Sequence, residues 1–194
     1  MDRMHMRLFE LASPFLDTRE NGEHTRISYE FAGRLLDEEQ GDPEVVFPAI
    51  ILHDVGWKRI PEELQLTAFG PGKRDMNLNR VHEVEGAKIA GGILAELGYP
   101  APLIEEITEI ILGHDSRKQA ISKSDAVVKD SDKLWRYSDH AMHINTERFG
   151  MTFRENLERL GRTLDAWFLT AAGRRMASER LLELESTYAV ELSH

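Results

Sequence analysis

The sequence predicts an all-α fold, a single-domain helical bundle, and three observations support this prediction. Apolar residues recur at the helical spacing i, i+3, i+7 through most of the 194 residues. Glycines and prolines fall between these periodic stretches, where they end and start helices. No stretch alternates apolar and polar residues over the length of a useful strand. Because the length is near that of one domain, we expect residues 1–194 to form a single domain.

Each expected helix is placed by its apolar periodicity and by the residues that flank it. Gly41, Asp42 and Pro43 separate the first helix from a short apolar one, Gly98 ends the third, and two prolines start the fourth. Residues 56–79 contain three glycines and two prolines, so we expect a long loop with at most short turns, and a candidate lid. The expected helices span about 22–39, 43–54, 80–97, 102–114, 124–139, 152–170 and 174–190.

The composition excludes several classes of function. There is no cysteine, which excludes disulfides, thiolate metal sites and a cysteine nucleophile. A formal net charge of −10 argues against a nucleic-acid polymer or an anionic membrane as partner. A small anionic substrate stays open, because bound cations can reverse the field within one cleft. The N-terminus lacks the apolar core of a signal peptide and no apolar run is long enough to span a membrane, so the expected compartment is the cytoplasm.

The residues with metal-binding chemistry are histidines and aspartates at inward positions. His53 and Asp54 end the apolar run of the second helix, while His24 and His114 share helix faces with apolar residues. One inward histidine is more often a core residue than a ligand, and Asp54 alone could be a helix cap. Several such residues on different helices, in a chain with eight histidines, predict a metal centre instead. Nitrogen and oxygen donors suit Mn, Fe, Zn, Ni, Co or Mg.

The order of these residues resembles the HD-domain superfamily of metal-dependent phosphohydrolases, in which a histidine, a His-Asp pair and a distant aspartate bind metal. His24, His53 and Asp54 supply the first three, and the segment 129–134 contains an aspartate followed by Lys-Leu, as in the family. This resemblance covers about 22–139 and points to Asp132, which also lies on an apolar stripe. Asp130, about 200° away on the same helix, is the fallback. The helices of about 145–190 are expected to pack on this core.

Two further histidines extend the resemblance to the binuclear members of the superfamily. His82 and His114 lie in segments that look like the two extra histidine motifs of those proteins. The resemblance implies that they hold a second ion and that Asp54 bridges the two, so one or two divalent ions are expected. Where the family usually has a second histidine, this chain has Asp115, which is either a further ligand or a helix-end residue.

The resemblance implies hydrolysis of a small phosphoester or nucleotide by metal-activated water. Asp54 would orient the ions and help to accept a proton, and Lys58, four residues later, is the second catalytic candidate and the first choice for a phosphate contact. Arg59, Arg80 and Arg117 are further substrate-binding candidates. Surface solvation is the alternative explanation for each of these basic residues.

Two other functions remain open at this point. Diiron oxygenases of the HD-domain type use the same histidines and aspartates to cleave C–C or C–P bonds, and a non-catalytic nucleotide-binding or interaction module would keep the metal for structure alone. The apolar periodicity of about 145–194 predicts core packing, with the surface of a homodimer as the alternative.

Overall fold

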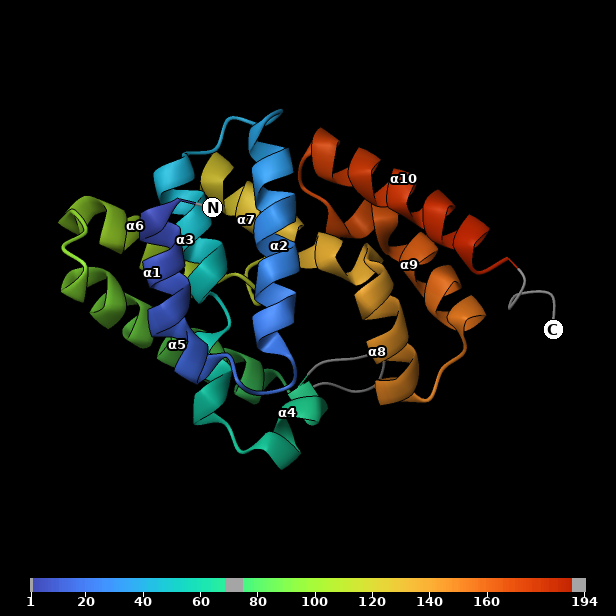
Figure 1. The fold of residues 1–194 in the computed structure, drawn as a ribbon, viewed down its shortest axis with the longest axis horizontal. Helices are drawn as coiled ribbons and strands as arrows, with labels where there is room; N and C mark the ends of the chain where they lie inside the picture. The colour runs from blue at the N-terminus through green and yellow to red at the C-terminus, as the bar shows by residue number, and fades with distance from the viewer. Residues whose placement is uncertain (1, 69–74, 190–194) are drawn as a thin grey trace.

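The computed structural model describes residues 2–68 and 75–189, and this part of the chain contains helices and no strand (Figure 1). The prediction of an all-α bundle is therefore confirmed. Three short 3-10 turns join the α-helices: η1 (Ser13–Phe15), η2 (Val55–Arg59) and η3 (Trp135–Tyr137). The α-helices in the described residues are α1 (Arg3–Ala12), α2 (Asn21–Leu36), α3 (Pro43–Leu52), α4 (Glu62–Ala68), α5 (Met76–Glu96), α6 (Ala101–Ile111), α7 (Lys123–Leu134), α8 (Asp139–Phe149), α9 (Phe153–Trp167) and α10 (Ala171–Thr187).

All seven predicted helices are present, and their ends differ from the prediction for local reasons. Helix α5 begins at Met76, four residues earlier than expected, because the Asp75 carboxylate accepts hydrogen bonds from the backbone N–H groups of Asn77 and Leu78 at 2.9 and 3.4 Å. Helix α6 ends at Ile111. His114, which we expected on the apolar face of that helix, therefore lies in the turn that follows it.

The sequence analysis missed three helices, α1, α4 and α8. Helix α4 lies within the stretch predicted to be a loop with at most short turns, and that prediction is wrong for 62–68 and for the start of α5 at Met76. Helix α8 was missed because it is mostly polar, yet Ser138 caps its start and Gly150, at φ 60°, ends it. The loop residues 69–72, part of the candidate lid, lie outside the described residues.

A single hydrophobic cluster runs from Leu8 of α1 to Tyr188 just after α10. Figure 1 shows α2 and α7 in the middle of the molecule, with α1, α3, α5 and α6 on one side and α8, α9 and α10 on the other. The apolar residues of the last three helices include Leu157, Leu160 and Leu181, which are buried in the same cluster. The helices on both sides of α2 and α7 therefore contribute to the same hydrophobic core.

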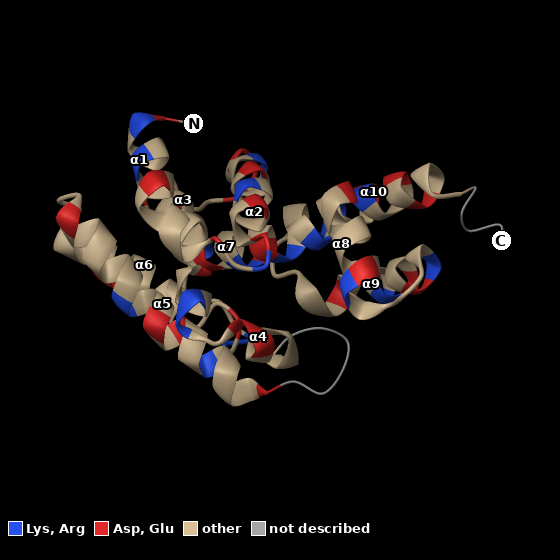
Figure 2. Cartoon of the chain, turned by 60° about the horizontal axis from the view of Figure 1, so that its bottom comes forward, with Lys and Arg blue, Asp and Glu red and all other residues tan. Residues whose placement is uncertain are grey.

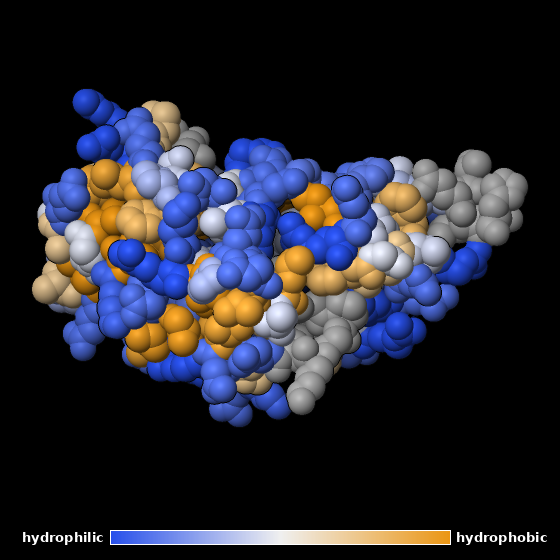
Figure 3. Space-filling view, turned by 90° about the horizontal axis from the view of Figure 1, so that it is seen from below, coloured by the Kyte–Doolittle hydropathy of each residue, from blue (hydrophilic) through white to orange (hydrophobic). Residues whose placement is uncertain are grey.

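The surface of the described helices is mixed in charge and polarity. Acidic and basic side chains are interspersed on most helices (Figure 2). Helices α4 and α5 lie at the bottom of Figure 1, and the view from below in Figure 3 shows apolar and hydrophilic side chains intermingled. No helix in the described part of the chain combines the length and the apolar character that crossing a bilayer requires.

Candidate metal centre

Six side chains from separate parts of the chain meet in the interior between these helices. None of the six residues is more than 9% exposed. They are the residues that the sequence analysis selected as metal ligands. His24 comes from α2, His53 caps the C-terminus of α3, Asp54 follows it, His82 comes from α5, His114 from the turn after α6 and Asp132 from α7.

Three of these residues form the first half of the centre. The Nε2 atoms of His24 and His53 lie 2.9 Å apart. One carboxylate oxygen of Asp132 lies 3.4 Å from Nε2 of His24 and 3.6 Å from Nε2 of His53. All three ligand atoms fall within 4.8 Å of one another, a spacing that allows a single ion to contact each of them.

The second half is built from His82 and His114, whose Nε2 atoms lie 3.2 Å apart. A carboxylate oxygen of Asp115 lies 3.6 Å from Nε2 of His82, and these three residues form another group with ligand atoms within 4.8 Å. The structure thus places Asp115 beside the second pair of histidines rather than at a helix end. Its side chain is 33% exposed, so it stands at the rim of the centre.

Asp54 lies between the two halves. Its Oδ2 atom is 3.5 Å from Nε2 of His24, while Oδ1 is 3.9 Å from Nε2 of His82 and 3.7 Å from Nε2 of His114. Oδ1 also lies 3.7 Å from Nε2 of His53. The carboxylate therefore borders both halves, with Oδ1 close to histidines of each and Oδ2 close to His24. Trp57 fixes this orientation, because its indole N–H donates to Oδ1 at 3.0 Å and its ring stacks on His82 at a centroid distance of 4.1 Å.

Two glycines allow the His-Asp turn to reach helix α5. A Cβ atom on Gly56 would lie 1.9 Å from the backbone oxygen of His82 and 2.5 Å from the backbone nitrogen of Gly86. On the other side of the contact, a Cβ on Gly86 would lie 3.4 Å from the oxygen of His53. Only a residue without a side chain fits at Gly56, and this close backbone contact brings His53 and Asp54 against His82.

The hydrogen bonds on the outer side of the histidine rings orient two of them for metal binding. Nδ1 of His53 donates to the carbonyl of Ile50 at 2.8 Å, and Nδ1 of His114 donates to the carbonyl of Ile111 at 2.7 Å. A carbonyl oxygen only accepts, so each Nδ1 carries the proton. When Nε2 is unprotonated, as metal binding requires, its lone pair points into the centre, as is usual for metal-ligating histidines.

The histidines of the centre differ in charge, because burial lowers the pKa of two of them and the ionised carboxylates raise the pKa of the other two. Burial lowers the pKa of His24 and of His82 to about 3, so both rings are neutral at pH 7. Burial alone would raise the pKa of Asp54, but the neighbouring charge of His53 and the hydrogen bond with His114 hold it well below its usual value. For His114, burial is outweighed by the hydrogen bond and charge of Asp54 and the charge of Asp115, which raise its pKa to about 10. The carboxylates thus attract positive charge to this site.

These features show that the residues are compatible with divalent metal binding. The donors are imidazole nitrogens and carboxylate oxygens, which suit borderline and hard divalent ions. The ligand atoms converge in buried groups of three, and two histidines are held in the ligating tautomer. Two buried carboxylates without a neighbouring positive charge would destabilise the folded protein, and a bound cation removes that destabilisation.

The structure also shows a supporting residue that the sequence analysis missed, Glu83. Its fully buried carboxylate accepts hydrogen bonds from the backbone N–H groups of Asp115 and Ser116 at 3.0 and 2.8 Å and from the Ser116 hydroxyl at 2.7 Å. Arg80 donates to the same carboxylate at 3.1 Å. Glu83 therefore ties helix α5 to the turn that carries His114. Its position next to His82 in the sequence could have indicated this supporting role.

Two neighbours of Asp132 on helix α7 serve the fold instead of the centre. Lys129, 1% exposed, donates to the backbone oxygens of Gly113 and His114 and so holds the same turn from the other side. Asp130 accepts hydrogen bonds from the backbone N–H groups of Leu169 and Thr170, at 2.9 and 2.8 Å. Asp130 thus joins α7 to the start of α10, and Asp132 is the aspartate that reaches the histidines.

The basic residues selected from the sequence lie mostly away from the centre. Lys58 is exposed and pairs with Asp17 at 2.6 Å, and Arg59 is exposed. Arg80 is bound to Glu83. None of these three lines a described cavity beside the histidines, whereas Arg117 does. Sequence alone could not decide this, because reach across a cleft depends on side-chain direction in the folded chain.

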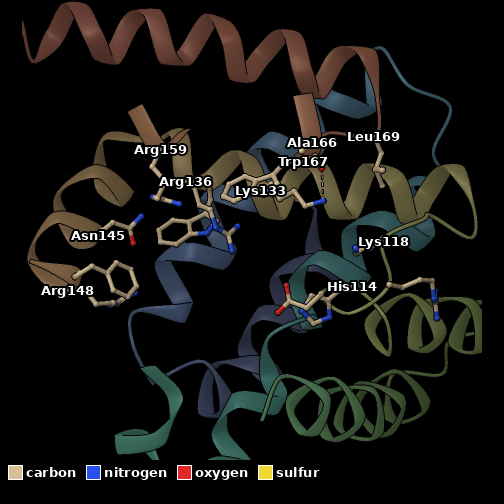
Figure 4. Close-up of a pocket in the computed structure, with 14 residues that line it drawn as sticks. His114, Lys118, Lys133, Arg136, Asn145, Arg148, Arg159, Ala166, Trp167 and Leu169 are labelled. Carbon is tan, nitrogen blue, oxygen red and sulfur yellow. Dashed lines mark hydrogen bonds between the residues drawn. The ribbon is translucent and has the colours of Figure 1, made fainter. Parts of the chain in front are cut away.

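Two adjacent cavities reach the centre, and other basic residues line them. A small chamber of about 60 Å³ touches His24 and Asp54, and a larger pocket of about 460 Å³ reaches His114 (Figure 4). Both have Arg136 and Arg148 in their walls, and the chamber also has Arg19. Arg136 follows Asp132 by four residues, so helical spacing could have indicated it. Arg19 and Arg148 had no such signal.

A helical bundle with an ordered His, His-Asp, His, His, Asp centre defines a class of metal-binding hydrolase fold. The chain matches the HD domain over residues 21–137, and it belongs to this family, whose members are mostly metal-dependent hydrolases. The resemblance drawn from the sequence is thereby confirmed. Neither the curated proteins nor the solved structures compared with the chain include a match.

Proposed function

We propose that the protein is a metal-dependent phosphohydrolase that acts on a small phosphoester or nucleotide. The observation that carries this proposal is the lining of the small chamber. Its walls contain Arg19, Arg136 and Arg148 together with His24 and Asp54. Guanidinium groups bind the non-bridging oxygens of a phosphoryl group through directed, charge-assisted hydrogen bonds. A site that combines such groups with metal ligands suits phosphoryl transfer to water.

The proposed metal ligands are the six residues selected from the sequence, and Asp115, which the geometry also groups with His82 and His114, stays outside this set. His24, His53 and Asp132 would hold one ion, His82 and His114 a second, and Asp54 would contact both. Bound divalent ions would supply an activated water and would neutralise charge on the phosphoryl oxygens.

Arg19 is held over the chamber by an unusual backbone. Arg19 and Glu20 have φ values of 51° and 62°, a conformation that costs non-glycine residues roughly 1–3 kcal/mol each. The guanidinium lies over the Trp57 ring at 4.3 Å, and Trp57 itself donates to Asp54. Burial lowers the pKa of Arg19 to about 10, against the opposing charge of Asp54, so it remains cationic at neutral pH. We assign Arg19 to binding the phosphoryl group.

Arg136 and Asp115 complete the proposed chemistry. Arg136 donates to the carbonyl of Asp132 at 2.8 Å, which anchors it at the chamber wall. Asp54 is a poor proton acceptor because its surroundings hold its pKa well below the usual value. Asp115 lines both cavities, so we assign it the exchange of protons with the attacking water or the leaving oxygen. Lys58 lines neither cavity, and the proposal gives its phosphate-binding role to the arginines.

The test combines metal analysis with a panel of phosphomonoesters and phosphodiesters. Wild-type protein should bind divalent metal and hydrolyse at least one ester. Asp54→Ala should lose both metal and activity, whereas Arg136→Gln should keep metal and lose activity. Asp165→Asn, at a side chain that is 97% exposed, is the matched control and should change neither. Survival of both metal and activity in Asp54→Ala would contradict the proposal.

The same preparation distinguishes the two other functions. A diiron oxygenase would use the same six ligands, and it would consume oxygen when loaded with iron while failing on every phosphoester. A non-catalytic module would retain tightly bound metal and turn over nothing in either assay. The three arginines of the chamber favour the hydrolase.

A further inference from the structure

The larger pocket reaches the centre directly. His114 and Asp115 lie in its walls, so a molecule bound at the centre can extend into it. The volume of about 460 Å³ exceeds what a phosphoryl group alone would fill. The pocket therefore has room for the part of the substrate that does not react.

The far wall of this pocket comes from helices beyond the segment that matches the HD domain, which ends at residue 137. Asn145 and Arg148 belong to α8, and Arg159 and Trp167 belong to α9. Figure 4 shows Asn145, Arg148 and Arg159 together at one side of the pocket, while His114 and Lys118 lie at the other. Asn145 and Arg159 thus lie away from the reacting end, whereas Arg148 also borders the chamber that touches His24 and Asp54.

The described lining of the pocket is strongly basic in a chain with a formal charge of −10. Its only acidic member among the described residues is Asp115. Two of the basic residues have carboxylate partners, Arg117 with Glu109 and Arg136 with Asp132. The basic residues of the described lining are Arg117, Lys118, Lys133, Arg136, Arg148 and Arg159.

Arg159 and Asn145 are the groups best placed for recognition at the far side. Asn145 is 5% exposed and lines the pocket, where its amide can bind an oxygen acceptor. Arg159 is half-buried, and its guanidinium donates at 2.7 Å to Asn156, a fully buried residue that in turn contacts the sulfur of Met142 at 3.3 Å. This chain of contacts sets the direction of Arg159.

We propose that the substrate carries a second anionic group, a phosphate or a carboxylate, at the end away from the scissile phosphoester, and that Arg159 and Asn145 bind it. This inference rests on the proposed hydrolase function and specifies its substrate class. Trp135 and Trp167 line the stretch between the two ends and would contact the connecting part.

The first test measures binding alone, using tryptophan fluorescence, since two of the three tryptophans of the chain line the pocket. The probes are alkylphosphonates with about two to six methylene groups and the matched phosphonates that end in a carboxylate. Wild-type protein should bind the carboxylate-bearing member at least about tenfold more tightly at one or more chain lengths. Arg159→Gln should reduce that preference to less than about threefold. Arg162→Gln, at a 70% exposed side chain on the same helix, should retain it.

A second variant shows whether the result for Arg159→Gln is only a folding defect. Kinetic measurements distinguish a failure of this inference from a failure of the proposed function. Asn145→Asp places a repelling charge in the pocket and should lower the affinity for the carboxylate-bearing probes only. For hydrolysed esters, Arg159→Gln should raise KM for doubly anionic substrates by a larger factor than for singly anionic ones.

Two outcomes distinguish the second-anion site from the proposed hydrolase function. The second-anion site would be overturned if wild type and both variants, Arg159→Gln and Asn145→Asp, preferred the carboxylate-bearing probes to the same degree. This holds even if the protein hydrolyses phosphoesters. A preference that depends on Arg159, in a protein that hydrolyses no ester, would support the anion site and refute the proposed hydrolase.

Discussion

Replacement of Glu83 tests whether the second half of the centre depends on the turn after α6. In the folded protein its carboxylate accepts four hydrogen bonds, from two backbone N–H groups, the Ser116 hydroxyl and Arg80. In Glu83→Gln, one oxygen can still accept from the backbone, but the new amide N–H₂ group faces the Arg80 guanidinium, another donor. The variant loses the charge-assisted part of the network.

The expected cost follows from that count. A hydrogen bond to a charged group contributes about 1.5–3 kcal/mol, and Glu83→Gln effectively removes the one from Arg80, so the free energy of unfolding should fall by about that amount. Glu83→Ala leaves all four donors without their acceptor and should cost about 3–5 kcal/mol. Urea unfolding of the metal-depleted protein, monitored by circular dichroism, measures both values.

Glu83→Gln should weaken metal binding only at the half of the centre that contains His82 and His114. Glu83 holds the backbone of Asp115 and the turn that carries His114, and loss of such an outer partner typically lowers metal affinity by about 10–100-fold. His24, His53 and Asp132 come from other elements, so the first ion should bind as before. Calorimetric titration of a divalent metal into metal-depleted protein resolves the two steps.

The matched control is Glu85→Gln, two residues along the same helix, where the carboxylate pairs with Lys88 on the outer face at 2.6 Å. It should change neither stability nor either binding step appreciably. Equal weakening of both steps in Glu83→Gln, or no weakening of either, would refute the reasoning, because the turn would then not position the second half selectively.

Three further outcomes follow from the same structure. Asp132→Asn should lower metal affinity by more than the roughly 100-fold typical of an outer partner, whereas Asp130→Asn should keep metal and lose about 1–3 kcal/mol of stability. Gly56→Ala should cost at least about 3 kcal/mol, since its Cβ meets backbone at 1.9 Å, while Gly92→Ala, with no atom within 4 Å, should gain about 0.5–1 kcal/mol. Chelation of metal present at about 100 times its Kd should lower Tm by roughly 5–10 °C.

Each of these outcomes has a direct check. Metal content after dialysis and urea unfolding distinguish the two aspartate variants, and loss of metal by Asp130→Asn at full stability would reverse the assignment. Thermal unfolding compares the two glycine variants, and a stable Gly56→Ala would mean that the His-Asp turn does not approach α5 closely. An unchanged Tm after chelation and dialysis would show that bound metal does not stabilise the folded chain.

Periodicity predicted the helices whose apolar faces are strong and missed those whose sequence is mixed. Helix α2 was found because Ile27, Phe31 and Leu35 repeat on one face and are buried together. Helix α8 was missed because its positions are mostly polar, and packing against neighbouring helices together with its end residues stabilises it. Local pattern reports a helix only when one face is clearly apolar.

The candidate ligands could be selected from sequence because each is a polar residue at an inward position, and their order matched a known pattern. The roles of neighbouring polar residues could not be selected in this way. Asp130 and Asp132 are both buried, and only the folded chain shows that one meets Thr170 and the other His24. Lys58 is close to Asp54 in sequence, yet its side chain turns to Asp17.

The sequence by itself determined the fold class, the order of the candidate ligands and the absence of thiolate donors, because these depend on periodicity and residue type. The tertiary structure decided which half of the centre each ligand joins, how Asp54 lies between them, and that Glu83 and Lys129 hold the turn of His114. It also decided that α8 and α9, far along the chain, bring Arg148 and Arg159 to the pocket. The physical reason is that direction and distance between side chains are set by packing of elements remote in sequence, which no local pattern encodes.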